Sequence, residues 1–287
     1  MRKALRSVLD FLLFSNVFMS LCAVAQALVT FHLIKSEPDY PVLALLFTST
    51  LGIYNFCILI SKPKHPQRSP HLRVRWFFAH YRLMVTFTIV SLLSLVPLFF
   101  LVSAASRILL VFLGIISFCY GMPLFSLDDK KFGLRNIPGL KPFLITIVWT
   151  LSVVLLPIMQ AHEVQVTMRD TIILLAKRFL FIFALTVPFD IRDLFHDNEL
   201  GVRTIPVMLG EKLAYQFCQV LLGGYIVLLF IYQKTFNTDF LALTFVAFLT
   251  GWLIFRSKWK KNEYYYFFYL DGVLILQYLF LILFSFL

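Results

Sequence analysis

The sequence predicts an all-α protein that crosses a membrane many times, and three observations support this. The chain has 287 residues, of which 60% are hydrophobic and 14% are charged, whereas a soluble domain is about 45–50% apolar and about 25% charged. Its mean hydropathy is +0.84. The apolar residues also fall in runs of about 20, the length of a helix that spans a bilayer. Together these features exclude an ordinary soluble enzyme, a disordered chain and a secreted disulfide scaffold.

Nine apolar runs predict nine transmembrane helices, which form a single domain over residues 1–287. The expected spans are 9–34, 40–60, 81–102, 105–122, 141–160, 167–189, 213–233, 238–255 and 264–287. Basic clusters separate these runs in order: 2–6 before the first, 62–82 after the second, 130–141 after the fourth, 192–212 after the sixth and 256–261 after the eighth.

The distribution of basic residues predicts the orientation of the bundle. Twenty of the 26 Lys and Arg residues lie in the N-terminal tail and in loops two, four, six and eight; four lie in the other loops and two inside the sixth span. Cytoplasmic loops accumulate Lys and Arg. We therefore expect the N-terminus and these loops to be cytoplasmic, and the C-terminus to lie on the opposite side. This topology accounts for the net charge of +11, so we expect no nucleic-acid partner.

An acidic cluster follows the sixth span, on a side that is otherwise strongly basic. Asp190, Asp193 and Asp197 are spaced i, i+3 and i+7, which places them on one face of a continuing helix. Three neighbouring carboxylates repel one another unless a cation lies between them, and Mg²⁺ prefers oxygen ligands while keeping positions open for phosphate. The alternative is a solvated helix end with three surface acids.

The segment around these acids resembles the second aspartate motif of the UbiA superfamily of intramembrane prenyltransferases. In that motif, an Asp-rich helix end is followed by Gly and by a Thr-hydrophobic-Pro-Val stretch that ends in Leu-Gly. The matching residues are Asp190, Asp193, Asp197, Gly201, Thr204, Pro206, Val207, Leu209 and Gly210. The resemblance implies a UbiA-like bundle of nine membrane helices. It also implies that Asp193 and Asp197, assisted by Asp190, hold Mg²⁺ on the diphosphate of an isoprenyl donor.

The first aspartate motif of that family, Asn-xxx-Asp-xxx-Asp, is only partly present. Asn55 is in register, but Leu59 and Pro63 stand at the two Asp positions, and neither side chain binds a metal. Lys62 follows Asn55 at i+7, so we hypothesise that its positive charge partly replaces the lost metal complex. The alternatives are that Lys62 only sets topology and that Asn55 makes an interhelical hydrogen bond.

Three further residues are candidate phosphate or substrate contacts. Tyr120 matches the Tyr of a family Tyr-xxx-Lys element whose Lys is replaced here by Leu124. Lys141 lies at the start of the fifth span, where a snorkelling lysine is the alternative. Arg203 lies inside the matched segment and is otherwise one more topology charge.

Three ionisable residues fall inside predicted spans, where charge is costly. For Lys177 and Arg178 we expect a structural role, either in snorkelling or in pairing with an acid. Asp271 needs a partner in the ninth span; we expect it to contribute to helix packing, with orientation of an acceptor as the alternative.

The function predicted from the sequence is transfer of an isoprenyl group from a prenyl diphosphate to a lipid-soluble, mostly aromatic, acceptor in the membrane. Mg²⁺ and basic groups would draw off the diphosphate. One alternative is a degenerate relative that binds isoprenoid lipid or a partner without turnover. Another is a small-molecule transporter, although transporters often contain repeats and none is evident here.

Overall fold

The computed structural model describes a bundle of helices with one short pair of strands. Described are residues 2–122, 125–127, 130–132, 137, 139–161, 164–192, 204–259 and 262–286, with all side chains of these except 2, 3, 125–127 and 130–132. The helices are α1 (Arg2–Phe14), α2 (Val17–Leu33), α3 (Tyr40–Ile60), α4 (Leu72–Ala79), α5 (Tyr81–Phe100), α6 (Ala104–Gly121), α7 (Leu140–Gln160), α8 (Met168–Arg192), α10 (Ile205–Leu209), α11 (Glu211–Gln233), α12 (Thr238–Ser257) and α13 (Val273–Ser285), with a 3-10 turn at Pro66–Arg68 and a π-helix at Tyr265–Leu270. Strands β1 (Phe125–Leu127) and β2 (Lys130–Phe132) pair antiparallel.

The predicted all-α membrane bundle is confirmed. Within the described ranges, eight helices are long and apolar enough to cross a membrane, and the bent pair α1 and α2 supplies a ninth span. The predicted span over 9–34 corresponds to α1 and α2 together, which meet at a bend of 63° that was not predicted. The bend lies at Asn16, whose φ is 69°. Asn adopts this left-handed conformation more readily than most residues.

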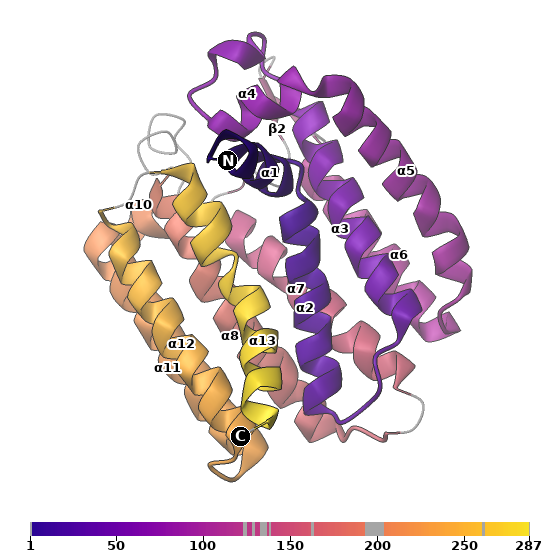
Figure 1. Cartoon of the computed structure of the whole chain (residues 1–287), viewed down its shortest axis with the longest axis vertical. Helices are drawn as coiled ribbons and strands as arrows, with labels where there is room; N and C mark the ends of the chain where they lie inside the picture. The colour runs from indigo at the N-terminus through magenta and orange to yellow at the C-terminus, as the bar shows by residue number, and fades with distance from the viewer. Residues whose placement is uncertain are drawn as a thin grey trace.

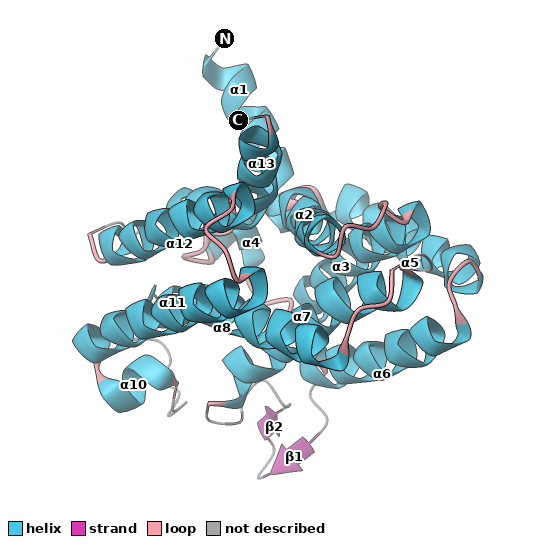
Figure 2. Cartoon of the chain, turned by 90° about the horizontal axis from the view of Figure 1, so that it is seen from below, coloured by secondary structure: helices cyan, strands magenta, loops and turns pink. Residues whose placement is uncertain are grey.

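The helix α1 lies outside the main bundle. Figure 2 shows it extending away from the ring of longer helices. Its first half exposes Leu5 and Val8, whereas Leu13 and Phe14 at its end are buried. The first membrane helix proper is therefore α2, and the bend places Asn16 at the inner end of a short amphipathic segment.

The long helices close into a ring that is divided in two. Helix α3 packs on α2, α5 and α6, and the ring continues through α7, α8, α11, α12 and α13, which packs back on α2. Contacts between α2 and α7 cross the ring and separate a lobe of α3, α5 and α6 from a lobe of α8, α11, α12 and α13 (Figure 1).

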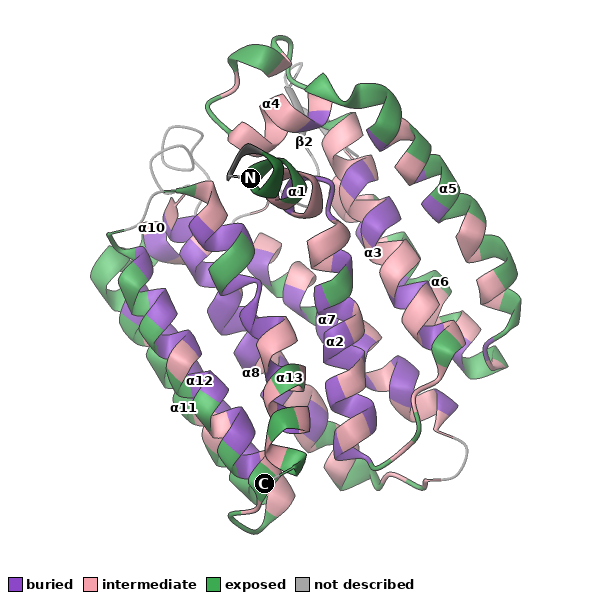
Figure 3. Ribbon diagram, in the orientation of Figure 1, coloured by how far each residue is buried: buried purple, intermediate pink, exposed green. Residues whose placement is uncertain are grey.

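Burial differs strongly between these lobes. Only 17% of the apolar stretch of α5 or α6 is buried, against 56% for α8 and 50% for α12. Figure 3 shows the same contrast, with buried residues concentrated along α8 and its neighbours. Among these eight helices, α8, which leads into the predicted acidic cluster, has the most buried apolar stretch.

A buried guanidinium joins four helices in the interior. Arg178 on α8 is 3% exposed and donates to the side-chain oxygens of Gln26, Gln277 (3.1 Å) and Thr30 (3.4 Å). Gln277 in turn donates to the Tyr225 hydroxyl at 3.1 Å. These partners lie on α2, α13 and α11, so Arg178 is held by neutral oxygens in a packing role and does not extend toward a membrane surface.

Its neighbour Lys177 has a different environment. Lys177 is 1% exposed, and its Nζ lies 5.2 Å from the ring centroid of Tyr232. In the described part of the chain, that Nζ has no hydrogen-bond partner. The ammonium therefore rests on an aromatic face.

Candidate functional site

The buried end of α8 carries the first predicted site residue. Asp190 lies in the last turn of α8 and is 2% exposed. Its Oδ1 accepts a 2.7 Å hydrogen bond from Nζ of Lys141, in the first turn of α7. The packing of α7 on α8 thus brings together two residues that the sequence assigned to one site. The predicted residues Asp193, Asp197 and Arg203 lie outside the described residues.

A second buried cluster surrounds Asn55 on α3. Asn16 donates through Nδ2 to Oδ1 of Asn55 at 2.6 Å, and Oδ1 of Asn16 accepts a hydrogen bond from Nη2 of Arg73. Because a guanidinium only donates, this order fixes the orientation of both amides. It leaves Nδ2 of Asn55 and Nε of Arg73 buried without a partner among the described residues.

Arg73 reaches this cluster because a distant carboxylate holds helix α4. Glu263 accepts from the backbone N–H groups of Leu72 (2.7 Å) and Arg73 (3.0 Å), the first residues of α4. Burial acts to raise the pKa of Glu263, but the hydrogen bonds from His71 and from these amides lower it below its ordinary value. The carboxylate therefore caps the helix and sets the direction in which Arg73 points.

Two guanidinium groups meet at one aromatic ring. Cζ of Arg73 lies 5.0 Å and Cζ of Arg192 lies 5.7 Å from the ring centroid of Phe267. Burial lowers the pKa of Arg73, while its electrostatic neighbours Tyr54 and Asp271 raise it and Arg192 lowers it. A guanidinium remains protonated in proteins, so both arginines bring positive charge beside Asp271, which is 6% exposed.

The remaining predicted residues lie away from this cluster or at its border. Lys62 is exposed, with its Nζ 5.8 Å and 5.5 Å from the ring centroids of Phe78 and Tyr81. The aromatic surface of α4 and α5 holds it, so its proposed function as a phosphate contact stays a prediction. Tyr120 is half-buried at the end of α6 and is an electrostatic neighbour of Tyr54.

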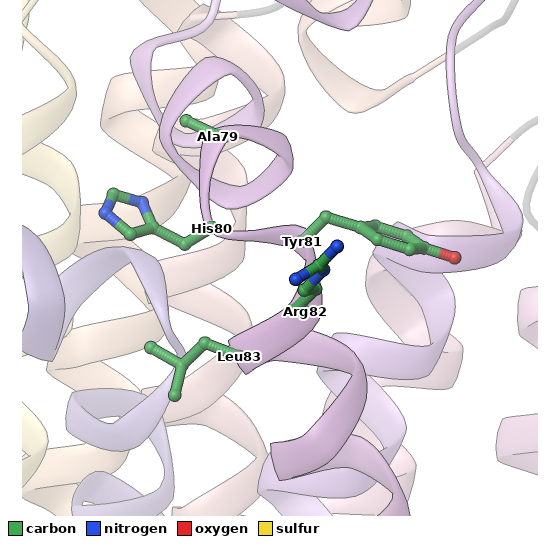
Figure 4. Close-up of a pocket in the computed structure, with 5 residues that line it drawn as sticks. All are labelled: Ala79, His80, Tyr81, Arg82 and Leu83. Carbon is green, nitrogen blue, oxygen red and sulfur yellow. The ribbon is translucent and has the colours of Figure 1, made fainter.

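Two of the hollows in the described structure differ in size and in the residues around them. The larger, of about 470 Å³, lies at the corner between α4 and α5 and is lined by Ala79, His80, Tyr81, Arg82 and Leu83. Figure 4 shows that His80 and Tyr81 point away from each other there, so their polar groups do not converge. The smaller, of about 10 Å³, is lined by Leu13, Asn16, Phe18, Met19, Arg73, Phe267 and Asp271. Although it has room for only about one water, it is the hollow that adjoins the chemistry.

The described residues do not fit a bound Mg²⁺. No group of three His, Cys, Asp or Glu side chains comes close enough to share a metal within the ranges that the structure describes. Oδ1 of Asp190 is bonded to Lys141, and the cluster at Asn55 presents hydrogen-bond donors where a hard cation requires oxygen ligands. Asp193 and Asp197, the other two predicted metal ligands, lie outside the described ranges.

Three solved structures resemble the fold of this chain. An apo UbiA homologue from Aeropyrum pernix K1 has a TM-score of 0.68 at 13% identity, over 94% of this chain and 99% of that one. A UbiA homologue from Archaeoglobus fulgidus bound to GPP and Mg²⁺ has a TM-score of 0.65 at 12% identity, over 97% and 100%. The fold is UbiA-like. A digeranylgeranylglyceryl phosphate synthase has a TM-score of 0.57 at 17% identity, over 99% and 98%. No family sequence model matches the chain, and a search of curated proteins finds no significant match.

Sequence reasoning missed the roles of Asn16, Arg73 and Arg192 in this UbiA-like fold. Both arginines were counted as topology charges, since hydropathy does not show that α4 and the end of α8 turn a guanidinium inward. Asn16 offered a usable signal: it follows Ser15 and interrupts an apolar run. A polar pair at that position indicates a bend or a buried hydrogen bond.

Proposed function

We propose that the protein is an intramembrane prenyltransferase that moves an isoprenyl group from a prenyl diphosphate to a lipid-soluble, aromatic acceptor. The observation that carries this proposal is the set of buried donors on Arg73 and Asn55, beside the end of α8, in a UbiA-like fold. The neighbours support the same chemistry: one is a homologue bound to GPP and Mg²⁺, and another is named as a prenyl-lipid synthase.

The residues of this chain act mainly on the departing diphosphate. Arg73, Arg192 and Lys141 supply fixed positive charge as the bond between the allylic carbon and the diphosphate oxygen breaks, with the electron pair leaving on the diphosphate. A low-dielectric interior strengthens such stabilisation of developing charge. The allylic carbon then bonds to an electron-rich carbon of the acceptor, which loses its proton. The aromatic rings of Phe189, Tyr266 and Phe267 face Arg192 and exclude water from this region.

The metal and the orientation belong to the same proposal. We propose that Asp193 and Asp197, which lie outside the described residues, would hold Mg²⁺ with the assistance of Asp190, and that the ion would neutralise diphosphate charge. The end of the bundle with α1, α4 and α10 would face the cytoplasm, and the C-terminus, at the other end in Figure 1, would face the opposite side. The excess of basic residues in the corresponding loops supports this orientation.

Purified full-length protein tests the activity directly. With Mg²⁺, a panel of prenyl diphosphates and candidate aromatic acceptors, we expect release of inorganic diphosphate and formation of a prenylated lipid. The double variant Asp193→Ala, Asp197→Ala should lower release at least about 100-fold, since such groups contribute several kcal/mol. Lys258→Gln, in the eighth loop, is the matched charge control. Release by the double variant at the wild-type rate would contradict the proposal.

A second function is favoured by one specific observation. Leu59 and Pro63 replace both carboxylates of the first aspartate motif, which suits a protein that binds an isoprenoid diphosphate without turning it over. Binding of donor without diphosphate release in the same assay would select this function.

A further inference from the structure

We propose that the half of the site around Asn55 binds the phosphate oxygens of the donor directly, through Arg73 and Asn55, and uses no metal there. This inference deepens the proposed function and rests on it. Asn55 matches the Asn of the first aspartate motif, but the two carboxylates of that motif are absent here. Another group must therefore bind the diphosphate on this side. The structure offers a guanidinium from α4, a helix that the sequence did not predict.

The chemical character of the unsatisfied atoms identifies the ligand class. Nδ2 of Asn55 and Nε of Arg73 are buried and unpartnered in the described structure, and both are donors. A buried donor that is left unpaired is destabilising, so these two atoms are suited to bind an acceptor. A phosphate presents several acceptor oxygens and negative charge, and it suits Arg especially well. A hard cation such as Mg²⁺ requires oxygen ligands, and these two donors cannot supply them.

The donors are held in place before any ligand arrives. Asn16, in its left-handed conformation at the start of α2, binds both Asn55 and Arg73. Glu263 fixes the start of α4, and the Phe267 ring supports the guanidinium of Arg73. A site built this way needs little reorganisation on binding, which favours affinity.

The hollow beside Arg73 sets a condition on binding. Its volume of about 10 Å³ fits about one water, so a phosphate enters only if the surrounding elements move apart. The elements around it are α1 and α4 on one side and the π-helix on the other, with α1 packed on α4. An outward shift of α1, α4 and the π-helix would enlarge this hollow, which Phe18 and Met19 of α2 also line.

The test measures binding with and without metal. Full-length protein in detergent is titrated with geranyl and farnesyl thiodiphosphates, once with Mg²⁺ and once with EDTA. We expect wild-type affinity in EDTA to stay within about tenfold of the value with Mg²⁺. We expect Arg73→Gln to weaken metal-free binding about 30-fold, which corresponds to loss of one charge-assisted contact, and Asn55→Leu to weaken it about fivefold.

Arg75→Gln is the matched control, because Arg75 lies on the same helix but donates to the backbone oxygen of Ser69 at 2.7 Å. It should bind within threefold of wild type. Glutamine at position 73 keeps a donor for Asn16, and thermal unfolding of each variant shows whether it folds.

The outcomes are distinct. Wild-type binding that requires Mg²⁺ and vanishes in EDTA overturns this inference and leaves the proposed function standing. Equal losses for Arg73→Gln and Arg75→Gln also overturn it. Absence of binding in both conditions overturns the proposed function together with the inference.

Discussion

Two arginines in this protein, the buried Arg178 and the half-buried Arg73, have different surroundings. Arg178, in the middle of α8, makes hydrogen bonds to Gln26, Gln277 and Thr30, all of them on long membrane helices. Arg73, on the short helix α4, has one such bond, to Asn16, and borders a hollow. In both side chains Nε is buried without a partner among the described residues, so the difference lies in the number of bonds and in the hollow. The contrast supports a packing role for Arg178 and the ligand-binding role that we propose for Arg73.

The difference follows from the elements that carry the two side chains. Helix α8 is packed against α7 and α11 over its length, so its polar side chains find partners on rigid neighbours. Helix α4 has only eight residues and is held at its first turn by Glu263. Function concentrates where the local packing is weaker and can rearrange, which supports the binding role that we propose for Arg73.

The largest expected effect is on stability, at the Arg178 network. Gln26→Leu removes an acceptor from a buried guanidinium and also the bond from Gln26 to the Leu274 carbonyl (2.7 Å). We expect a loss of about 2–3 kcal/mol in the free energy of unfolding, measured by chemical denaturation in detergent. Arg73→Gln should change stability by less than about 1 kcal/mol. If the two variants lose stability equally, the comparison is broken.

The next effect concerns the ion pair of Lys141 and Asp190. Lys141→Met leaves the buried carboxylate of Asp190 without the 2.7 Å partner that holds Oδ1, which should lower stability by about 2 kcal/mol. The double variant Lys141→Met, Asp190→Asn should recover most of that loss, since the charge is then gone. A double-mutant cycle of unfolding free energies measures the coupling. Additive losses would show that the pair contributes nothing.

A smaller effect should appear as a pH dependence at α4. The pKa of Glu263 is lower in the folded protein than in the unfolded chain. Its stabilisation is therefore complete above the unfolded value of about 4.3 and is lost as the pH falls through the folded value. We expect the fluorescence of Trp76, on α4, to change in this acid range before the bundle unfolds, with a local contribution of about 1 kcal/mol. Glu263→Gln should abolish that early transition. Its persistence in the variant would show that Glu263 does not hold α4.

The smallest effect is expected at Lys177, next to Arg178. Its buried Nζ rests on Tyr232 without a hydrogen bond among the described residues. Lys177→Met keeps the apolar stem and removes the charge, so stability should stay equal or rise by up to about 1 kcal/mol. A loss above about 2 kcal/mol would mean that Lys177 belongs to the structural network.

Several features of the fold followed from the sequence because they depend on local composition. The length of each apolar run predicts a span, and α3, α7 and α11 begin and end within two residues of the predicted ranges. The bend in the first span was not predicted, because hydropathy is averaged over Ser15 and Asn16. A bend of 63° there needs only one left-handed residue.

The candidate site divides in the same way. The pairing of Lys141 with Asp190 was within reach of the sequence, since both flank the inner ends of adjacent spans. The inward direction of Arg73 could not be predicted from the sequence. Glu263, 190 residues further along the chain, sets this direction by accepting a hydrogen bond from the backbone N–H of Arg73. Lys62 has the i+7 spacing that suggests a phosphate contact; its Nζ lies near the rings of Phe78 and Tyr81, and its contact with phosphate stays a prediction.

By itself, the sequence determined that this chain is a helical membrane bundle with eight or nine candidate spans in its described part, and it predicted an acidic helix end beside basic loops. Those properties come from hydrophobicity and charge summed along short stretches. Only the tertiary structure decided which of the many basic residues face inward. That choice depends on hydrogen bonds and ring contacts between segments that are far apart in the chain, and no local pattern encodes it.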